Sequence, residues 1–534
     1  MNKNNGTDTI ISIISWGLLQ GLILAMFNII YSVATKKYLT NKYVDETLHI
    51  VHEVKMPIKL PKVVYVYTTH NDFMPARLLQ NAKQTYKNFE VWISDGSDNL
   101  KIIKEIDRFV KKHKFNLYRL GGKGSKDKSD NLNHFLKYSG VEFDYLMIGD
   151  SDEIFDKNFI NCNIRFFYSK KYEKLAYVSP LNQCYKTRNL YTNVMSGLDN
   201  ISFIKTDLIK TFVLREYPNL FGASCLISGK FINSMGGIFP NSVCEDYYTE
   251  NIAVTHGWIG ALSPLTVCTQ AYDINIKAHY SRIMRVVDWI IKLRKTDTFV
   301  NYNERYSGWF SRSMILLFAP LLLVISILGI SVIIWWVVLF WNDLIHNVTF
   351  ISIILTSILS LIVTMSIVNY DNAKINGIIN SLLFPFFMVL YSFSFISYIC
   401  KHWFNTMILS KYSNFQQGTQ KKFFTKSLSL AFKKILPDVI MFMCFSIPTC
   451  CFNIFCTNLM IHNTSLLYVY ILVNMILGSL SLSFLSTIIL YLFSFVKVFD
   501  YNPNKFIYYK NKYVSFDRIK NKFYAENKKT KRLC

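Results

Sequence analysis

The pattern of hydrophobic and polar positions divides the chain into two kinds of sequence. Between residues 62 and 312, short apolar runs alternate with stretches whose apolar residues recur at helical spacing. The strand-like runs are rich in β-branched and aromatic residues and cover 63–67, 89–94 and the stretch that begins at Tyr145. The helix-like stretches cover 75–87, 98–113 and 130–139. Because strands alternate with helices, the sequence predicts an α/β domain with a largely parallel sheet.

Long stretches without charged residues make up most of the remaining sequence. Each is long enough to reach across a hydrocarbon layer of about 30 Å. They cover residues 10–35, 313–341, 348–368, 377–400, 439–460 and 465–496. We expect an α-helical membrane domain from all of them except 377–400, which contains Pro385 and is predicted to be interfacial or re-entrant. The first stretch is too long for the apolar region of a cleavable signal peptide.

The charge balance points to the membrane surface. Basic residues outnumber acidic ones by 59 to 35, which gives a net charge of +24. They cluster beside the apolar stretches, so the positive-inside rule and anionic headgroups explain them better than nucleic-acid binding does. The segment 401–437 holds seven lysines and no acid, and the tail from Lys497 is also basic. We therefore expect a multi-pass protein of the cell membrane with 36–312, 401–437 and the tail in the cytosol.

The cysteines argue against a protein held together by disulfides or zinc. None of the 11 cysteines forms a Cys-x-x-Cys pair. Several of them, among them Cys444, Cys450 and Cys451, lie in apolar runs. We therefore expect reduced and buried thiols.

Polar side chains gather where the predicted strands end. The carboxyl ends of parallel strands open into a ligand crevice, so these loops are expected to form one site. The loops are Thr68-Thr69-His70-Asn71-Asp72, Ser94-Asp95-Gly96-Ser97-Asp98, Lys128-Ser129-Asp130-Asn131-Leu132-Asn133, Asp150-Ser151-Asp152 and Cys244-Glu245-Asp246. Each alone has a plain structural interpretation, such as an acidic turn or a helix N-terminus. Their order and spacing together indicate one ligand-binding site.

Asp150 and Asp152 are the candidate metal ligands. Two carboxylates two positions apart beyond a strand end can share a hard divalent cation, Mg²⁺ or Mn²⁺, that prefers oxygen ligands. Such a cation can neutralise a diphosphate. The alternative is an acidic turn that closes the strand.

Together the motifs resemble those of the family 2 glycosyltransferases, specifically the membrane-embedded synthases of cellulose, hyaluronan, chitin and bacterial exopolysaccharides. The resemblance covers residues 62–290 by motif and the later apolar stretches by layout. It implies a cytosolic GT-A-like domain that binds a UDP-sugar. The implied parts are an N-terminal transmembrane helix (1–35), a linker (36–61), the transferase domain (62–280), interfacial helices (281–312), a transmembrane region (313–496) with a gating-like loop (401–437), and a basic tail (497–534).

The resemblance also implies roles for single residues. Thr69 and Asp72 match the first nucleotide loop of the family, and Asp95 matches its uridine-contacting acid. Lys128 begins the element beside the diphosphate, and Gly222-Ala223-Ser224 matches the loop beside the donor sugar.

The same resemblance assigns the metal, the base and the substrate contacts. Asp150 and Asp152 match the Asp-x-Asp that holds metal and diphosphate, while Glu245 and Asp246 match a Thr-Glu-Asp motif at the substrate. Glycosyl transfer needs a base for the attacking hydroxyl, and a metal ligand is held ionised and occupied. The separate acid Asp246 therefore fits the base, and the resemblance implies direct displacement with inversion.

Two further elements bear on the acceptor. The family motif Gln-x-x-Arg-Trp corresponds here to Arg282-Ile283-Met284-Arg285-Val286, so Arg285 matches while Gln and Trp are replaced. Trp289 lies three residues on and is a substitute ring or an interfacial aromatic residue. Phe423-Phe424-Thr425-Lys426 resembles the gating loop, with Lys426 placed to meet the diphosphate. The alternative for Lys426 is a basic patch at lipid headgroups.

From these features we expect a membrane-bound, inverting, metal-dependent hexosyltransferase. It would transfer a hexose from a UDP-sugar to a growing capsular or extracellular homopolysaccharide and extrude the product across the membrane. A non-processive transferase that acts on a membrane lipid is the alternative. A transporter or channel with a cytosolic nucleotide-binding domain is the alternative of another class, although the apolar stretches lack the ionisable residues that mark ion paths.

Overall fold

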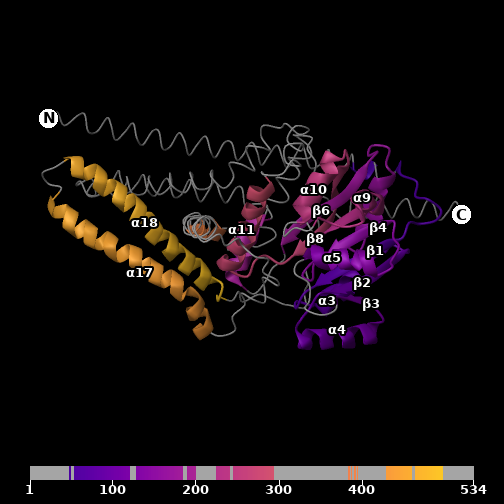
Figure 1. The fold of residues 1–534 in the computed structure, drawn as a ribbon, viewed down its shortest axis with the longest axis horizontal. Coiled ribbons are helices and arrows are strands. Elements are labelled where there is room, and N and C mark those ends of the chain that lie inside the picture. The colour runs from indigo at the N-terminus through magenta and orange to yellow at the C-terminus, as the bar shows by residue number, and fades with distance from the viewer. Residues whose placement is uncertain are drawn as a thin grey trace.

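The computed structural model describes two regions, an α/β domain and a pair of long helices (Figure 1). It describes residues 53–120, 128–184, 189–199, 224–240, 245–293, 428–459 and 464–496, with isolated positions at 47–49, at 220 and between 383 and 398. The predicted stretches 10–35, 313–341 and 348–368, most of 377–400, and the gating-like loop up to 427 lie outside the described residues.

The α/β domain is built on an eight-stranded mixed sheet with the order β3-β2-β1-β4-β7-β6-β8-β5. The strands are β1 (Val63–Thr69), β2 (Phe89–Asp95), β3 (Asn116–Arg119), β4 (Tyr145–Gly149), β5 (Ile154–Phe155), β6 (Leu175–Cys184), β7 (Cys225–Ser228) and β8 (Ile259–Gln270). Strands β3, β2, β1 and β4 pair in parallel, as the alternation of strands and helices predicts. The second half is mixed: β7 runs antiparallel to β4 and β6, and β5 runs antiparallel to β8.

Helices cover the sheet and continue beyond it. They are α3 (Pro75–Asn81), α4 (Leu100–His113), α5 (Lys128–Tyr138), α6 (Phe159–Asn163), the 3₁₀ helix η2 (Ile164–Tyr168), α7 (Leu190–Asp199), α9 (Gly229–Ser234), α10 (Glu245–Thr255), α11 (Ile276–Leu293), α17 (Leu428–Leu459) and α18 (Thr464–Phe493). The predicted helices at 98–113 and 130–139 are confirmed by α4 and α5. The helix predicted at 75–87 ends at Asn81, because the following residues bond to a distant segment. Gln84 donates to the Asp156 carbonyl, and the Thr85 N–H donates to the Lys157 carbonyl.

Strand β1 forms the centre of the core. All seven of its residues are buried, as expected for a continuous apolar strand covered on both faces. Successive side chains point to opposite faces, so Tyr65 packs in the cluster that contains Ile106 and Phe109 of α4. Val66 packs on the other side, in the cluster that contains Phe135 of α5.

The end of β4 has no room for a side chain. A Cβ at Gly149 would lie 2.8 Å from the rings of Tyr65 and Phe155. The strand therefore ends in glycine directly before Asp150, and the acidic loop begins tight against the core.

Helices α17 and α18 form a hairpin of 32 and 30 residues that extends away from the α/β domain (Figure 1). The two helices pack together, with the rings of Phe445 and Phe484 stacked at 5.9 Å. Among the described helices, none combines the length and the apolarity that a membrane crossing requires. The spans predicted at 439–460 and 465–496 thus find no support there.

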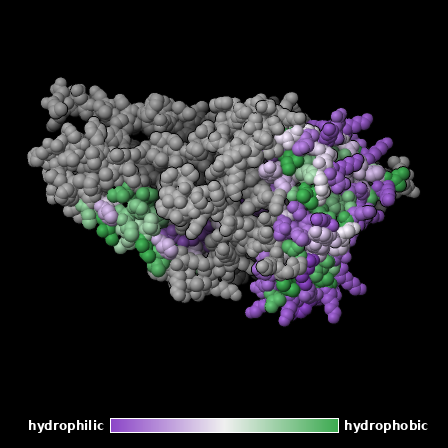
Figure 2. Space-filling model, in the orientation of Figure 1, coloured by the Kyte–Doolittle hydropathy of each residue, from purple (hydrophilic) through white to green (hydrophobic). Residues whose placement is uncertain are grey.

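The cysteine prediction is right in one region and wrong in the other. Cys162, Cys184, Cys225 and Cys268 of the α/β domain are free and buried. Cys444, Cys450 and Cys451 of α17 are also free, but they are exposed. An apolar composition alone therefore does not place a side chain of this hairpin in a protein interior. Figure 2 shows apolar residues on the visible surface of the hairpin, whereas the α/β domain shows mainly polar ones.

Candidate active site

The carboxyl ends of β1, β2 and β4 meet at one edge of the sheet. The register pairs Thr69 with Asp95 and Tyr67 with Gly149, so the three strands end side by side. The loops that follow these strands are therefore neighbours, although up to about 80 residues separate them in the sequence. This is the arrangement that the sequence predicts.

Asp72 ties the first of these loops to the acidic loop. Its Oδ1 accepts hydrogen bonds from the Thr69 hydroxyl at 2.9 Å and from the His70 N–H at 2.8 Å. Its Oδ2 accepts a hydrogen bond from the Ser151 hydroxyl at 2.7 Å. Asp72, predicted to bind nucleotide, is thus a fixed part of the wall of the site.

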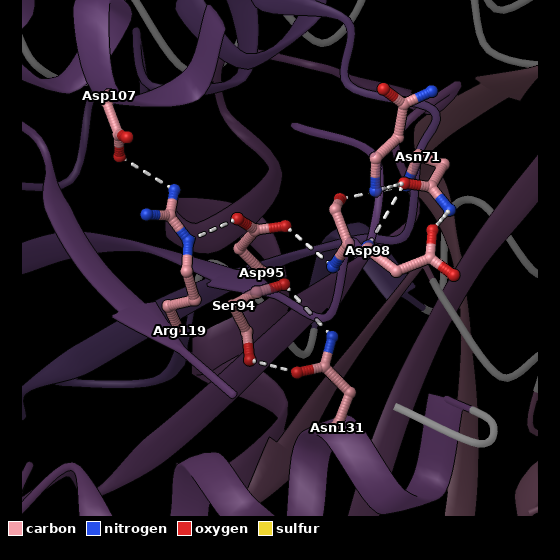
Figure 3. A network of polar contacts seen from close by, with 9 residues as sticks. Asn71, Ser94, Asp95, Asp98, Asp107, Arg119 and Asn131 are labelled. Atoms are coloured by element: carbon pink, nitrogen blue, oxygen red, sulfur yellow. Dashed lines mark hydrogen bonds and ion pairs between the residues drawn. The ribbon is translucent and has the colours of Figure 1, made fainter. Parts of the chain in front are cut away.

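Asp95 lies at the centre of a polar network under the loops (Figure 3). The residue is fully buried, and its Oδ2 accepts from Arg119 Nε at 2.8 Å while its Oδ1 accepts from the Ser97 N–H at 3.0 Å. Arg119 also lies 2.8 Å from Asp107 through Nη2. Arg119 therefore balances the charge of Asp95, the acid predicted to contact uridine. Nothing in the sequence indicated this role for Arg119.

The same network fixes the loop that follows β2. Ser94 and Asn131 exchange hydrogen bonds of 2.9 and 3.0 Å, which join the end of β2 to α5. Asn71 has a left-handed backbone with φ of 62° and reaches Asp98 through its side-chain amide at 2.6 Å. Figure 3 shows Asn131 of α5 directed at Ser94 of β2, and Asn71 beside Asp98.

Lys128 joins acids from two distant parts of the chain. It is the first residue of α5, and its Nζ lies 2.6 Å from Asp150 Oδ1 and 4.0 Å from Glu245 Oε1. Burial alone would lower the pKa of Lys128, but the Asp150 and Glu245 carboxylates outweigh it and raise the pKa. A firmly charged ammonium beside the candidate metal ligand Asp150 is suited to a phosphate group.

Asp150 and Asp152 differ in environment. The Asp150 side chain is 44% exposed, and its Oδ1 also accepts from the Thr68 hydroxyl at 3.2 Å. The Asp152 side chain is half-buried and accepts the Ala271 N–H at 3.2 Å. Burial, together with the charge of Asp150, raises the pKa of Asp152 to about 6. A cation between these two acids would favour their ionised forms.

These acids suit a metal that the substrate helps to hold. Within the described residues, no three His, Cys, Asp or Glu side chains are grouped so that they alone would hold a metal ion. Mg²⁺ and similar cations are commonly bound by one or two carboxylates together with substrate phosphates and water. The oxygen donors of Asp150 and Asp152 fit that type of site.

Glu153 supports the acidic loop from below, and the sequence analysis did not identify it. It is buried, and its Oε2 accepts the Asp150 N–H at 3.0 Å. Its Oε1 accepts a hydrogen bond from the hydroxyl of Ser224, a residue with φ of 63° directly before β7. Burial, followed by the charge of Asp150, raises the pKa of Glu153. The only signal in the sequence was a third acid directly after the Asp-x-Asp.

Glu245 and Asp246 lie in the first turn of α10, and Glu245 is the second acid near Lys128. Glu245 is buried, and burial with the charge of Asp246 raises its pKa to about 8. Asp246 is half-buried, so an acceptor hydroxyl can reach it. Helix α10 therefore brings the predicted base, Asp246, into the neighbourhood of Lys128 and Asp150.

The remaining predicted residues are placed only in part. Arg285 lies on α11, but the described side chains of this helix end before it. Lys426, Gly222 and Ala223 lie outside the described residues. Arg282 is described and forms an ion pair with Asp273, with Nε 3.0 Å from Oδ2.

The fold and the site define the class of a glycosyltransferase, and a comparison of the sequence names the family. The family model for glycosyl transferase family 21 matches residues 70–359, which are 290 of the 534 residues. The chain belongs to glycosyl transferase family 21. Its expected place among the family 2 synthases is not confirmed. No curated protein matches the sequence.

Several solved structures resemble the chain at low identity. The mannosyltransferase PcManGT from Pyrobaculum calidifontis, in complex with GDP-Man and Mn²⁺, is 16% identical over 55% of this chain and 81% of that chain, with a TM-score of 0.38. S. aureus TarS 1–349 with UDP-GlcNAc is 12% identical over 61% and 90%, with a TM-score of 0.33. GalNAc-T7 with UDP, GalNAc and Mn²⁺ is 11% identical over 46% and 52%, with a TM-score of 0.30.

Proposed function

We propose that this glycosyltransferase takes a hexose from a UDP-sugar and uses Mg²⁺ or Mn²⁺. The observation that carries the proposal is the position of Lys128, 2.6 Å from Asp150 and 4.0 Å from Glu245. Lys128 is a cation that can bind a phosphate group. Its position links Asp150 of the Asp-x-Asp pair to the acidic turn that holds Asp246. Transfer from a donor whose leaving group is a nucleoside diphosphate needs this combination of charges.

The chemistry divides among these residues. Asp150 and Asp152 would hold the metal, which supplies positive charge to the departing diphosphate when it is bound. Lys128 donates to a phosphate oxygen, and Asp246 accepts the proton of the acceptor hydroxyl. The acceptor oxygen forms a bond to the anomeric carbon as the bond from that carbon to the phosphate oxygen breaks. The electron pair leaves with the diphosphate, and the configuration inverts.

For the acceptor, we propose a growing capsular or extracellular homopolysaccharide that is extruded across the cell membrane. The net charge of +24 and the basic segment 401–437 beside apolar stretches support a membrane position with the α/β domain in the cytosol. Apolar side chains exposed on α17, such as Ile440 and Ile447, support contact with an apolar phase.

A membrane lipid is the second candidate acceptor. Val286 stands where an aromatic ring would hold a sugar face, and Arg282 is engaged with Asp273 inside the fold. Both observations weaken the acceptor motif on which polymer elongation depends. A transferase that adds one or two sugars to a lipid needs no such motif.

The test is to incubate the purified full chain with single nucleotide sugars, with and without EDTA, and to measure diphosphate release and product size. We expect UDP release from one UDP-sugar that stops in EDTA and returns with Mn²⁺ or Mg²⁺. Long polymer supports the first acceptor, and mono- or disaccharide lipid supports the second. Turnover that is unaffected by EDTA, or that uses only another nucleotide, would contradict the proposal.

A further inference from the structure

The turn between β8 and α11 lies against the acidic loop of the site. Strand β5, which begins two residues after Asp152, pairs with the end of β8 through Ile154 and Thr269. The next residue after β8, Ala271, donates its N–H to Asp152 Oδ2 at 3.2 Å. One carboxylate oxygen of the metal-binding Asp152 is thus oriented by the backbone of this turn.

Side chains of α11 hold the turn in place. Asp273 is buried, and its Oδ2 lies 3.0 Å from Arg282 Nε and 3.0 Å from His279 Nδ1. The Arg282 guanidinium also lies over the Tyr272 ring, 5.6 Å from its centroid. A planar guanidinium that both pairs with an acid and covers a ring restricts the turn more than a flexible ammonium would.

The opposite side of the turn is bound to α7. The Thr192 hydroxyl donates to the Asp273 carbonyl at 3.4 Å, and the Asn189 amide donates to the Ile274 carbonyl at 2.7 Å. The turn therefore has fixed contacts on both sides, and the Ala271 N–H has little freedom to leave Asp152. On the α11 side, contacts run through Asp273 and through Tyr272, whose hydroxyl lies 3.1 Å from His279 Nδ1.

We propose that Arg282 is a positioning residue that acts on the metal site through Asp273, rather than a contact for the acceptor sugar. It fixes the turn 271–275, and the turn holds the Asp152 carboxylate in its metal-binding orientation through the Ala271 N–H. The inference rests on the proposed metal role of Asp152. Arginine at this position supplies a permanent cation to the buried Asp273, which a glutamine could not do.

The chain contains a matched control for this ion pair. Lys277 is on the same helix and pairs with Asp438 of α17. The side chains of that pair are 18% and 9% exposed, and those of Arg282 and Asp273 are 29% and 8% exposed. Loss of the Lys277 pair removes a comparable interaction from α11, at contacts with Asp438 of α17 and Tyr491 of α18.

The experiment measures binding of Mn²⁺ to the full chain in the presence of UDP, by the loss of the free Mn²⁺ signal in electron paramagnetic resonance. Arg282→Ala and Asp273→Asn are expected to weaken Mn²⁺ binding by about 10- to 100-fold, the usual effect of losing a partner that orients a metal ligand. Arg282→Lys should recover part of the affinity, and Lys277→Met should leave it within about twofold. The unfolding midpoint of each variant shows that it is folded, and Arg282→Lys with Asp273→Asn carry the test if Arg282→Ala does not fold.

The outcomes separate the inference from the proposed function. Wild-type Mn²⁺ binding that is unchanged in Arg282→Ala and Asp273→Asn overturns the positioning role alone. An equal loss in Lys277→Met also overturns it, because the effect would then be a general loosening of α11. Absence of Mn²⁺ binding by the wild-type protein overturns the metal role of Asp152 and the positioning role with it. A raised KM for the acceptor with normal Mn²⁺ binding would assign Arg282 to the acceptor instead.

Discussion

Removal of Lys128 should destabilise the α/β domain, and the loss should grow with pH. The Lys128→Met variant keeps the aliphatic length of the side chain but leaves Asp150 and Glu245 without their shared cation. Two unit charges 4 Å apart attract by about 4 kcal/mol at an effective dielectric constant of about 20. Burial of the ammonium offsets several kcal/mol of this attraction. Because the Asp150 side chain is 44% exposed, solvent screens its share. We expect a net loss of about 2–3 kcal/mol at pH 8.5.

The pH dependence follows from Glu245, whose pKa burial and Asp246 raise to about 8. At pH 6 Glu245 carries its proton in the folded state, so the lysine has less negative charge to neutralise there. As the pH rises through 8, the wild-type carboxyl ionises beside Lys128. In the variant, the Glu245 carboxyl either ionises without a nearby cation or keeps its proton, because its pKa in the folded state is higher than in the wild type. The folded variant thus binds more protons than the folded wild type, and the difference in stability widens with rising pH.

The assay is thermal unfolding in EDTA, so that no metal replaces the missing charge, at pH 6 and at pH 8.5. The expected drop in the unfolding midpoint is about 5–10 °C at pH 8.5 and clearly less at pH 6. Lys137→Met is the control, since Lys137 lies on the same helix but is exposed. A drop that is equal at both pH values, or no larger than in the control, would refute the electrostatic reasoning.

Three further predictions address the metal, the base and the topology. Asp152→Asn should abolish transfer while the protein stays folded, and turnover that survives both this change and EDTA would reject the metal role. Asp246→Asn should bind UDP with near-normal affinity but lose transfer by about two to four orders of magnitude, as is usual for a general base; a collapse of UDP affinity would move Asp246 to the nucleotide site. A cysteine label near Gly418 should be accessible from the cytosol and one near His462 from outside, and an external signal at Gly418 would exclude the gating role of Lys426.

The parts of the fold that local patterns determine were predictable from the sequence. Strand β1 is a continuous apolar run because both of its faces are covered, and α4 shows its buried side through the spacing of Ile106 and Phe109. The early end of α3 was not predictable, because Gln84 and Thr85 leave the helical path to bond to a segment more than 70 residues away. A distant partner decides the boundary there.

The candidate site shows the same division. Parallel pairing alone brings Asp95 and Asp150 together, and both were predicted from their places after strands. Arg119 and Glu153 were missed, because an arginine or glutamate with a structural partner is recognisable only when that partner is known. Nothing within the sequence near Ala271 marks a backbone amide that will face a carboxylate more than 100 residues earlier.

The acidic loop between the two halves of the sheet is held from three sides, and this bears on how the site works. Asp72 bonds to Ser151 from the β1 side, Glu153 bonds to the Asp150 amide from below, and the turn after β8 bonds to Asp152. The first and third contacts come from the residues after β1 and β8, and the second comes from within the acidic stretch, so no single segment sets the positions of the candidate metal-binding oxygens. Carboxylates that are already oriented do not need to reorganise when a cation and a diphosphate arrive. The mixed half of the sheet, which the sequence did not predict, contributes to two of these restraints: Ser224, directly before β7, donates its hydroxyl to Glu153, and the turn follows β8.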